Sequence, residues 1–308
     1  MEIIRGLHSL QKHHKGNVVT VGNFDGVHLG HQEIIKQLKK HASKFGVPLT
    51  VITFHPNPQE FFAPETAPAK LTRFHDKMRL LEEYGVDRVL NIPFSASLAQ
   101  LEADDFIKNI LVDGLDTKHL VIGDDFRFGK NRKGDFKLLQ NAGESYEFSI
   151  EATPTYCVEN ERVSSTRIRQ AMARGDLSLA EKLLGRTFNI SGHVAHGDKR
   201  GRIIGFPTAN IRLKQQIAPT NGVYAVKITG LDNEYSGVAN IGVRPTVDGS
   251  QYLLEVHLFN FDQTIYNKRI NVHFEEFIRT EQKFDDLDTL VEQIKQDSTT
   301  AKELLRIN

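Results

Sequence analysis

The chain has 308 residues, a length typical of two domains, and its 39% apolar and 25% charged residues indicate a folded protein. Its 39 basic and 39 acidic side chains cancel, which argues against a protein that coats nucleic acid non-specifically. No apolar run approaches the ~18 residues that span a bilayer, the N-terminus lacks the apolar core of a signal peptide, and the single cysteine excludes an intrachain disulfide. We therefore expect a cytoplasmic protein that binds small molecules, without nucleic-acid or membrane partners, whose self-association these features leave open.

Strand-like and helix-like segments alternate through the first half. A short apolar strand is predicted at 18–21, and a helix begins near His31. The apolar positions of this helix share one face: Ile34, Ile35, Leu38, Ala42 and Phe45. A second apolar strand at 49–54 completes a strand–helix–strand unit, which indicates a parallel sheet. A further helical stretch ends at Gly85, and 87–94 and 118–126 are further strand candidates.

The pattern changes after about Leu184. Short strand-like runs broken by turns follow, at 188–194, 221–228, 235–241, 252–259 and 269–274. Five or six such strands predict a small antiparallel β-barrel, and helical periodicity returns from Leu287. The sequence therefore predicts an α/β domain over 1–183 and a β domain over 184–308 that ends in C-terminal helices.

The stretch GNFDGVHLGH, residues 22–31, joins the first predicted strand to its helix. Its two histidines, His28 and His31, could bind a metal, act as an acid/base pair, bind phosphate or simply pack. A zinc site is disfavoured because their spacing is three and no third ligand is evident nearby. A helix N-terminus at the carboxyl end of a strand favours phosphate, and Gly22 and Gly30 would let the backbone approach an anion.

The H-x-G-H pattern at 28–31 resembles the signature of the nucleotidyltransferase superfamily, and SSTRIRQ at 164–170 resembles its C-terminal element. Without the resemblance, the second run would be interpreted as a capped helix with a solvated arginine face. The resemblance implies that both stretches contact the triphosphate of ATP. In the second stretch the implied residues are Ser165, Thr166 and Arg169.

Longer runs resemble one family over essentially the whole chain. They are VGNFDGVHLGHQ, TFHPNP (53–58), GDDFRFGKNRKG (123–134), GRIIGFPTANI (201–211), NGVYAV (221–226), GVANIGVRPT (237–246), LEVH (254–257) and FIRTEQKF (277–284). The family is the bacterial bifunctional riboflavin kinase/FMN adenylyltransferase, also called FAD synthetase. The resemblance implies a Rossmann-like nucleotidyltransferase domain and a riboflavin kinase-like barrel. It also implies that riboflavin is phosphorylated to FMN and that FMN is adenylylated to FAD and pyrophosphate, with ATP as co-substrate and Mg²⁺ at both sites.

For adenylyl transfer, the nucleophile would be the FMN phosphate. Because this group is already an anion, positioning and charge neutralisation suffice and no general base is required. The resemblance implies catalytic roles for His28 and His31. It implies ATP or phosphate binding by Gly22, Phe24 and Gly30, and flavin binding by Phe54, Pro56, Pro58, Phe62 and Asp125.

Riboflavin phosphorylation differs, because the ribityl hydroxyl must lose a proton and a carboxylate base is expected. Glu255 occupies the position of the family's catalytic glutamate. Thr208 and Asn210 offer the oxygen ligands that Mg²⁺ prefers, and Gly201 and Gly205 would lie over the ADP phosphates. Two alternatives stay open: an enzyme with one active half, and a flavin or nucleotide sensor that binds without turnover.

Overall fold

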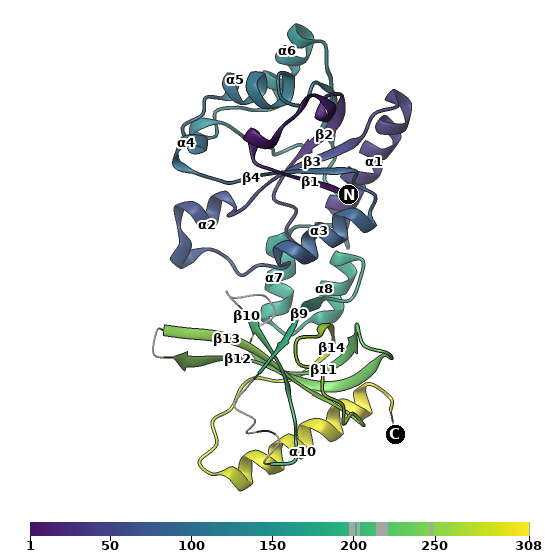
Figure 1. Cartoon of the computed structure of the whole chain (residues 1–308), viewed down its shortest axis with the longest axis vertical. Coiled ribbons are helices and arrows are strands. Elements are labelled where there is room, and N and C mark those ends of the chain that lie inside the picture. The colour runs from purple at the N-terminus through teal and green to yellow at the C-terminus, as the bar shows by residue number, and fades with distance from the viewer. Residues whose placement is uncertain (197–200, 202–203, 214–220, 247–248, 308) are drawn as a thin grey trace. The chain divides into compact units, whose positions relative to one another are not determined.

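The computed structural model describes residues 1–196, 201, 204–213, 221–246 and 249–307 (Figure 1). The chain forms two compact units, Met1–Pro68 with Phe74–Ser164, and Ala69–Arg73 with Ser165–Asn308. Two helices, α7 (Ser165–Ala173) and α8 (Leu177–Leu184), belong to the second unit, although the boundary predicted at 183/184 places all of α7, and α8 up to Leu183, in the first domain. They do so because they pack on each other and α8 contacts a barrel strand.

The first unit is built on a parallel sheet, as predicted. Within the described residues it has six strands, in the spatial order β1-β4-β3-β2-β5-β6. Their bounds are β1 Glu2–Arg5, β2 Asn17–Val21, β3 Leu49–Phe54, β4 Arg88–Ile92, β5 Thr117–Gly123 and β6 Ser149–Thr153. Both edge strands, β1 and β6, were absent from the sequence prediction. A hairpin of β7 (Cys157–Val158) and β8 (Glu161–Arg162) follows the sheet.

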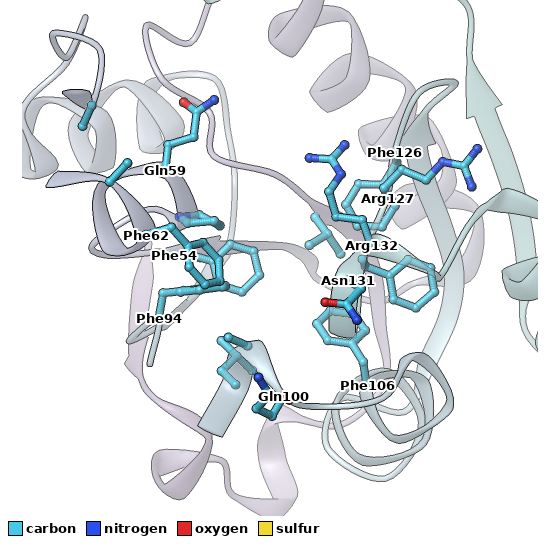
Figure 2. A pocket seen from close by; sticks show the side chains of 18 of the residues that line it. Phe54, Gln59, Phe62, Phe94, Gln100, Phe106, Phe126, Arg127, Asn131 and Arg132 are labelled. Carbon is cyan, nitrogen blue, oxygen red and sulfur yellow. The ribbon is translucent and has the colours of Figure 1, made fainter. Parts of the chain in front are cut away.

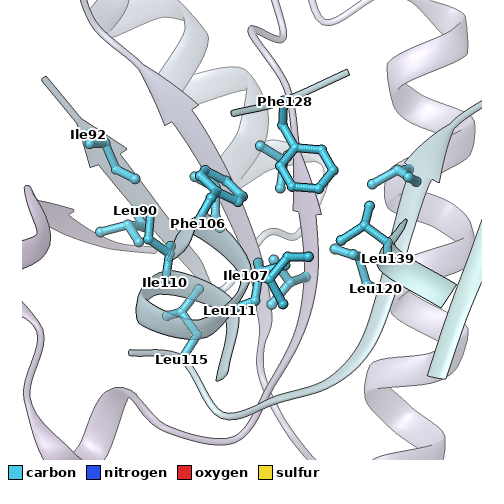
Figure 3. Packing of buried hydrophobic residues seen from close by; sticks show 14 of the residues in the cluster. Leu90, Ile92, Phe106, Ile107, Ile110, Leu111, Leu115, Leu120, Phe128 and Leu139 are labelled. Atoms are coloured by element: carbon cyan, nitrogen blue, oxygen red, sulfur yellow. The ribbon is translucent and has the colours of Figure 1, made fainter. Parts of the chain in front are cut away.

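Helices cover both faces of this sheet. The helices of this unit are α1 Leu29–Phe45, α2 Pro58–Phe62, α3 Phe74–Glu83, α4 Ala96–Ala99, α5 Ala103–Phe106 and α6 Phe136–Tyr146, with a π-helical segment at Ile107–Val112. Of these, α1 and α3 cover one face, and α5, the π-helical segment and α6 cover the other. Side chains alternate along a strand, so neighbours on β2 enter different cores. Val18 packs with residues of α1 and α3, whereas Val19 belongs to the cluster that α5 and the π-helical segment complete (Figure 3). The strands are apolar on both faces because both are covered.

The second unit contains the predicted antiparallel barrel. In the described part of the chain it closes through six strands in the order β10-β13-β12-β11-β14-β9. Their bounds are β9 Asn189–Ala195, β10 Ala209–Leu213, β11 Gly222–Thr229, β12 Tyr235–Thr246, β13 Gly249–Leu258 and β14 Arg269–Arg279. The strand β10 is an addition to the prediction. One helix, α10 (Leu287–Leu304), follows the barrel among the described residues, where the sequence predicts helices in the plural.

Candidate active sites

The two histidines of the glycine-rich stretch lie at the junction of β2 and α1, where the sequence predicts them. His28 is the N-cap of α1, and its Nδ1 accepts a hydrogen bond from the backbone N–H of His31 at 3.4 Å. The two rings stack with centroids 3.7 Å apart and planes inclined by 15°. His28 is buried, whereas His31 is half-buried. The pair therefore forms a stack of two imidazoles at the N-terminus of a helix.

The glycines of this stretch make room for rings. A Cβ on Gly30 would lie 3.3 Å from the His28 ring, and a Cβ on Gly22 would lie 3.1 Å from the Phe24 ring. Phe24 is itself buried and its ring centroid is 4.7 Å from that of His31. Because the Phe24 ring is buried in this packing, Phe24 can contribute to phosphate binding only through its backbone. Sequence reasoning assigned the glycines to anion approach and did not foresee this packing role.

A buried lysine, Lys77 of α3, was missed by the sequence analysis. Its side chain is 8% exposed, and its Nζ donates to the backbone carbonyl of Asn23 at 2.8 Å and to Thr53 Oγ1 at 3.4 Å. A positive charge is thus held against the glycine-rich loop. Together with the helix N-terminus and the imidazoles, it suits this junction for a polyphosphate. A single lysine in an amphipathic helix gave no sequence signal.

The predicted second phosphate element begins α7 and belongs to the second unit. Thr166 is exposed, and Ser165 and Arg169 are half-buried. The guanidinium Nε of Arg169 donates to the backbone carbonyl of Ala69 at 2.6 Å. This contact joins α7 to the short segment 69–73 of the same unit.

The first unit has an aromatic cavity of about 810 Å³, within the range typical of ligand pockets. Three predicted flavin residues line it: Phe54, Pro58 and Phe62. Figure 2 shows Phe54, Phe62 and Phe94 facing Phe126 and Phe106 across the opening. Further polar residues line the cavity: Gln59, Gln100, Arg127, Asn131 and Arg132. Phe94, Phe106 and Phe128 come from separate elements, so no single sequence run indicated them.

Two predicted flavin residues lie elsewhere: in the described structure, neither Pro56 nor Asp125 lines this cavity. Pro56 lies between β3 and α2. Asp125 is exposed, and its Oδ2 forms an ion pair with Nη2 of Arg162 at 2.7 Å. The carboxylate therefore already has a cationic partner on β8.

The barrel has its own cavity, of about 390 Å³, which brings four predicted residues together. They are Gly201, Thr208, Asn210 and Glu255. Gly201 has no space for a Cβ, because the Phe206 carbonyl lies against it. Gly205 is not among the described residues that line the cavity; it is exposed, with a φ of +84° that favours glycine.

Strand register explains why Glu255 points into this cavity between two amides. On β13 it is opposite Asn210 of β10 and opposite Asn240 of β12. Residues opposite each other across strands share a face, so the carboxylate and both amides lie on one wall. Glu255 is half-buried, whereas its neighbours Leu254 and Val256 are buried. Asn240 was missed by the sequence analysis, although it stands in a run that carries the resemblance.

The donor set of the cavity suits Mg²⁺. The Asn210 side-chain N–H₂ donates to the Thr208 carbonyl at 3.3 Å, which leaves the amide oxygen as the ligand atom. The Thr208 hydroxyl adds a further hard oxygen in the same cavity. Magnesium prefers such oxygens and fills its remaining positions with water and phosphate.

An ion pair between the half-buried Arg279 and the buried Asp297 joins α10 to the barrel at this cavity. Arg279 Nε donates to Asp297 Oδ1 at 2.8 Å, and Nη2 donates to Oδ2 at 2.7 Å. The Gln293 amide also donates to Asp297 Oδ1 at 3.0 Å. Because both carboxylate oxygens are occupied, we interpret Asp297 as a residue that fixes α10 against β14.

Comparison with known proteins agrees with this two-site arrangement. Residues 10–167 match the FAD synthetase family and residues 184–305 match the riboflavin kinase family. The chain is 50% identical over 305 residues to the bifunctional riboflavin kinase/FMN adenylyltransferase of Escherichia coli K12, covering 98% of this chain and 97% of that protein. It is 48% identical over 303 residues to the protein of the same name from Haemophilus influenzae, covering 98% of each.

A solved structure described as a macrolide-efflux protein from Streptococcus pneumoniae shares the fold of this chain. The two are 32% identical, with a TM-score of 0.82 and coverage of 98% of this chain and 99% of that one. None of the helices in the described residues is both long and apolar enough to cross a membrane.

Proposed function

Because this chain belongs to the family of bifunctional riboflavin kinase/FMN adenylyltransferases, we propose that its two cavities divide the family's two reactions between them. The barrel cavity phosphorylates riboflavin to FMN, and the cavity of the first unit adenylylates FMN to FAD. The observation that supports this assignment is that a carboxylate, a hydroxyl and side-chain amides line one cavity, whereas the other is lined mainly by aromatic side chains.

In the kinase reaction, the riboflavin terminal hydroxyl attacks the γ-phosphorus of ATP, and its proton passes to Glu255. The bond to ADP breaks, so FMN and ADP are the products. Bound Mg²⁺ would supply charge neutralisation at the phosphates, and Thr208 and Asn210 are the residues that would hold it. Asn240, opposite the base, is placed to orient the Glu255 carboxylate.

In the adenylylation reaction, a phosphate oxygen of FMN attacks the α-phosphorus of a second ATP, and pyrophosphate leaves. No proton has to be removed from the nucleophile, which agrees with a site that offers cations and N–H donors. His28 and His31 stabilise the charge on the phosphates, and Lys77 holds the loop before them. The flavin ring occupies the aromatic cavity, between the walls that carry Phe54 and Phe126.

The remaining predicted residues keep their proposed roles. Phosphate contacts are proposed for Gly22, Phe24, Gly30, Ser165, Thr166, Arg169, Gly201 and Gly205, and flavin contacts for Pro56, Pro58, Phe62 and Asp125. We also keep the boundary at 183/184, which is supported by the start of the riboflavin kinase match at 184. A cytoplasmic location is likewise proposed.

The test measures the two half-reactions separately on the full chain by chromatography of the flavin products. Riboflavin with MgATP is expected to give FMN and then FAD, and FMN with MgATP is expected to give FAD. His28→Ala should lose FAD formation and keep FMN formation, whereas the exposed His193→Ala should change neither. Absence of product from both half-reactions would favour a sensor, and equal loss of both activities in His28→Ala would refute separate sites.

A further inference from the structure

Two histidines and a glutamate gather in the first unit at a distance from the nucleotide site. His41 lies near the C-terminal end of α1, His119 near the start of β5, and Glu151 in the middle of β6. His41 is 13 residues beyond His28 (41 minus 28), which corresponds to about 20 Å along the helix axis. Neither proposed reaction uses this cluster.

The potential ligand atoms of the cluster converge on one carboxylate oxygen. Glu151 Oε2 is 3.0 Å from His41 Nε2 and 3.8 Å from His119 Nε2. All three ligand atoms lie within 4.8 Å of one another. A tetrahedral zinc ion with bonds of about 2.0–2.2 Å separates its ligands by about 3.3–3.6 Å, so the cluster is close to that size.

The other ring nitrogen of His119 has a partner. His119 Nδ1 lies 2.7 Å from the Ser149 hydroxyl, which also lies 3.3 Å from the Lys118 carbonyl. When the hydroxyl donates to that carbonyl, its oxygen accepts from Nδ1–H, and the lone pair of the ring is on Nε2, the atom that faces Glu151. Metal-binding histidines are commonly oriented in this way by a partner on their other nitrogen.

His119 Nε2 is left without a partner. The residue is 5% exposed, and within the described residues no hydrogen bond reaches this nitrogen. A buried ring nitrogen without a hydrogen-bond partner therefore lies 3.8 Å from a carboxylate oxygen, an arrangement that a cation would satisfy.

A second cluster of the same composition lacks this feature. In Glu2, His13 and His14, the buried His14 has a partner on each ring nitrogen: Nδ1 accepts from the Gln11 backbone at 2.9 Å and Nε2 contacts Glu2 at 2.9 Å. Glu2 also pairs with the Arg88 guanidinium at 3.3 Å. That cluster is already satisfied without an ion and provides an internal control.

We propose that His41, His119 and Glu151 form a binding site for a divalent transition metal of the zinc class, through His119 Nε2, His41 Nε2 and a Glu151 oxygen. The two rings stack with centroids 3.8 Å apart. A bound metal lies close to the plane of each imidazole that holds it, which two stacked rings do not allow. The His41 ring therefore turns on binding and holds its proton on Nδ1. Its side chain is only partly buried, which permits this rotation. Glu151 is 44% exposed, so water completes the coordination. The ion would link α1 to β5 and β6.

The test adds zinc to the metal-free full chain without nucleotide and measures binding by calorimetry, with cobalt substitution as a spectroscopic check. Removal of a residue that only orients a metal ligand weakens metal binding by about 10–100-fold, and removal of the ligand itself should cost at least as much. We therefore expect His41→Ala and Glu151→Gln each to weaken zinc binding at least a hundredfold and to remove the visible bands of four-coordinate cobalt. Both side chains are partly exposed, so the variants should fold, as checked by circular dichroism.

His13→Ala is the matched control, because it removes a histidine from the satisfied cluster. It is expected to bind zinc as the unaltered chain does, and magnesium is expected not to compete. The proposal is overturned if the unaltered chain binds no zinc at micromolar concentration. It is equally overturned if His41→Ala retains the affinity, or if His13→Ala loses it.

Discussion

Replacement of Glu255 by glutamine removes the proton-accepting oxygen of the barrel cavity and keeps the shape of the side chain. Glu255 is half-buried and faces Asn210 and Asn240 in the strand register. Both neighbours are neutral amides that can pair with a glutamine as well as with a carboxylate. Folding should therefore change little, and the substitution should act on the chemistry alone.

The size of the expected effect follows from the role of a general base. Such a group contributes about 10²–10⁴-fold to the rate. At 1.36 kcal/mol for each factor of ten, this corresponds to about 3–5 kcal/mol on the barrier of the kinase step. The loss should appear in kcat, with little change in KM for riboflavin, because the base acts in the transition state.

The assay follows FMN formation from riboflavin and MgATP, and FAD formation from supplied FMN, in the same preparation. Glu276→Gln is a suitable control, because Glu276 is an exposed carboxylate on β14 of the same barrel and does not line the cavity in the described structure. We expect Glu255→Gln to keep its rate of FAD formation from FMN. A kinase rate within threefold of the unaltered enzyme, or an equal loss of both activities, would refute the assignment of the base.

Three further predictions concern the scaffold of the sites. Gly30→Ala places a Cβ 3.3 Å from the His28 ring, so the ring must shift by a few tenths of an ångström and FAD formation should slow up to about tenfold, with FMN formation unchanged. Asp297→Ala leaves the guanidinium of Arg279 without its buried partner and should lower the free energy of unfolding by about 3–5 kcal/mol, measured by urea denaturation. Phe62→Ser removes a 66% exposed aromatic from the flavin cavity, worth about 0.5–1.5 kcal/mol, so KM for FMN should rise about two- to tenfold without loss of stability.

Each of these predictions has a contrary outcome. Equal slowing of both reactions in Gly30→Ala would mean that the substitution acts on folding instead of on His28. An Asp297→Ala chain as stable as the parent would mean that the ion pair contributes no net stability. An unchanged KM for FMN in Phe62→Ser would place the flavin outside the aromatic cavity.

The sequence predicted best the elements whose side-chain pattern depends only on local geometry. The strand at 18–21 and the following helix were correct because apolar periodicity reports which faces are covered. The strand β10 was missed because Pro207 precedes it and the run PTAN is typical of a turn; only its pairing with β9 and β13 makes it a strand. The boundary predicted from the sequence places helices α7 and α8 outside the compact unit to which they belong. The contact between α8 and the barrel decides their unit, and the local sequence gives no sign of that contact.

The same distinction separates the candidate-site residues. Glu255 and Asn210 lie in contiguous runs that carry a resemblance, and the barrel brings both to one cavity. Asp125 also lies in such a run, yet its ion pair is with Arg162, a hairpin residue 37 positions further on (162 minus 125), which spacing alone does not reveal. Lys77 gave no signal because one buried lysine looks like any solvated lysine until burial is known.

The register of β13 between β10 and β12 determines where Glu255 points, so the kinase rate reports whether the barrel has folded with the correct register. Alternate residues of a strand face opposite sides, so a slip of one position would turn Glu255 away from the cavity and bring Leu254 or Val256 into its place. Such a misaligned barrel would keep its strand content and its circular dichroism spectrum. The rate of FMN synthesis relative to FAD synthesis in one sample would then distinguish correctly refolded chains from chains whose β13 is shifted. The FAD-forming activity of the first unit would be the reference, because the shift does not affect it.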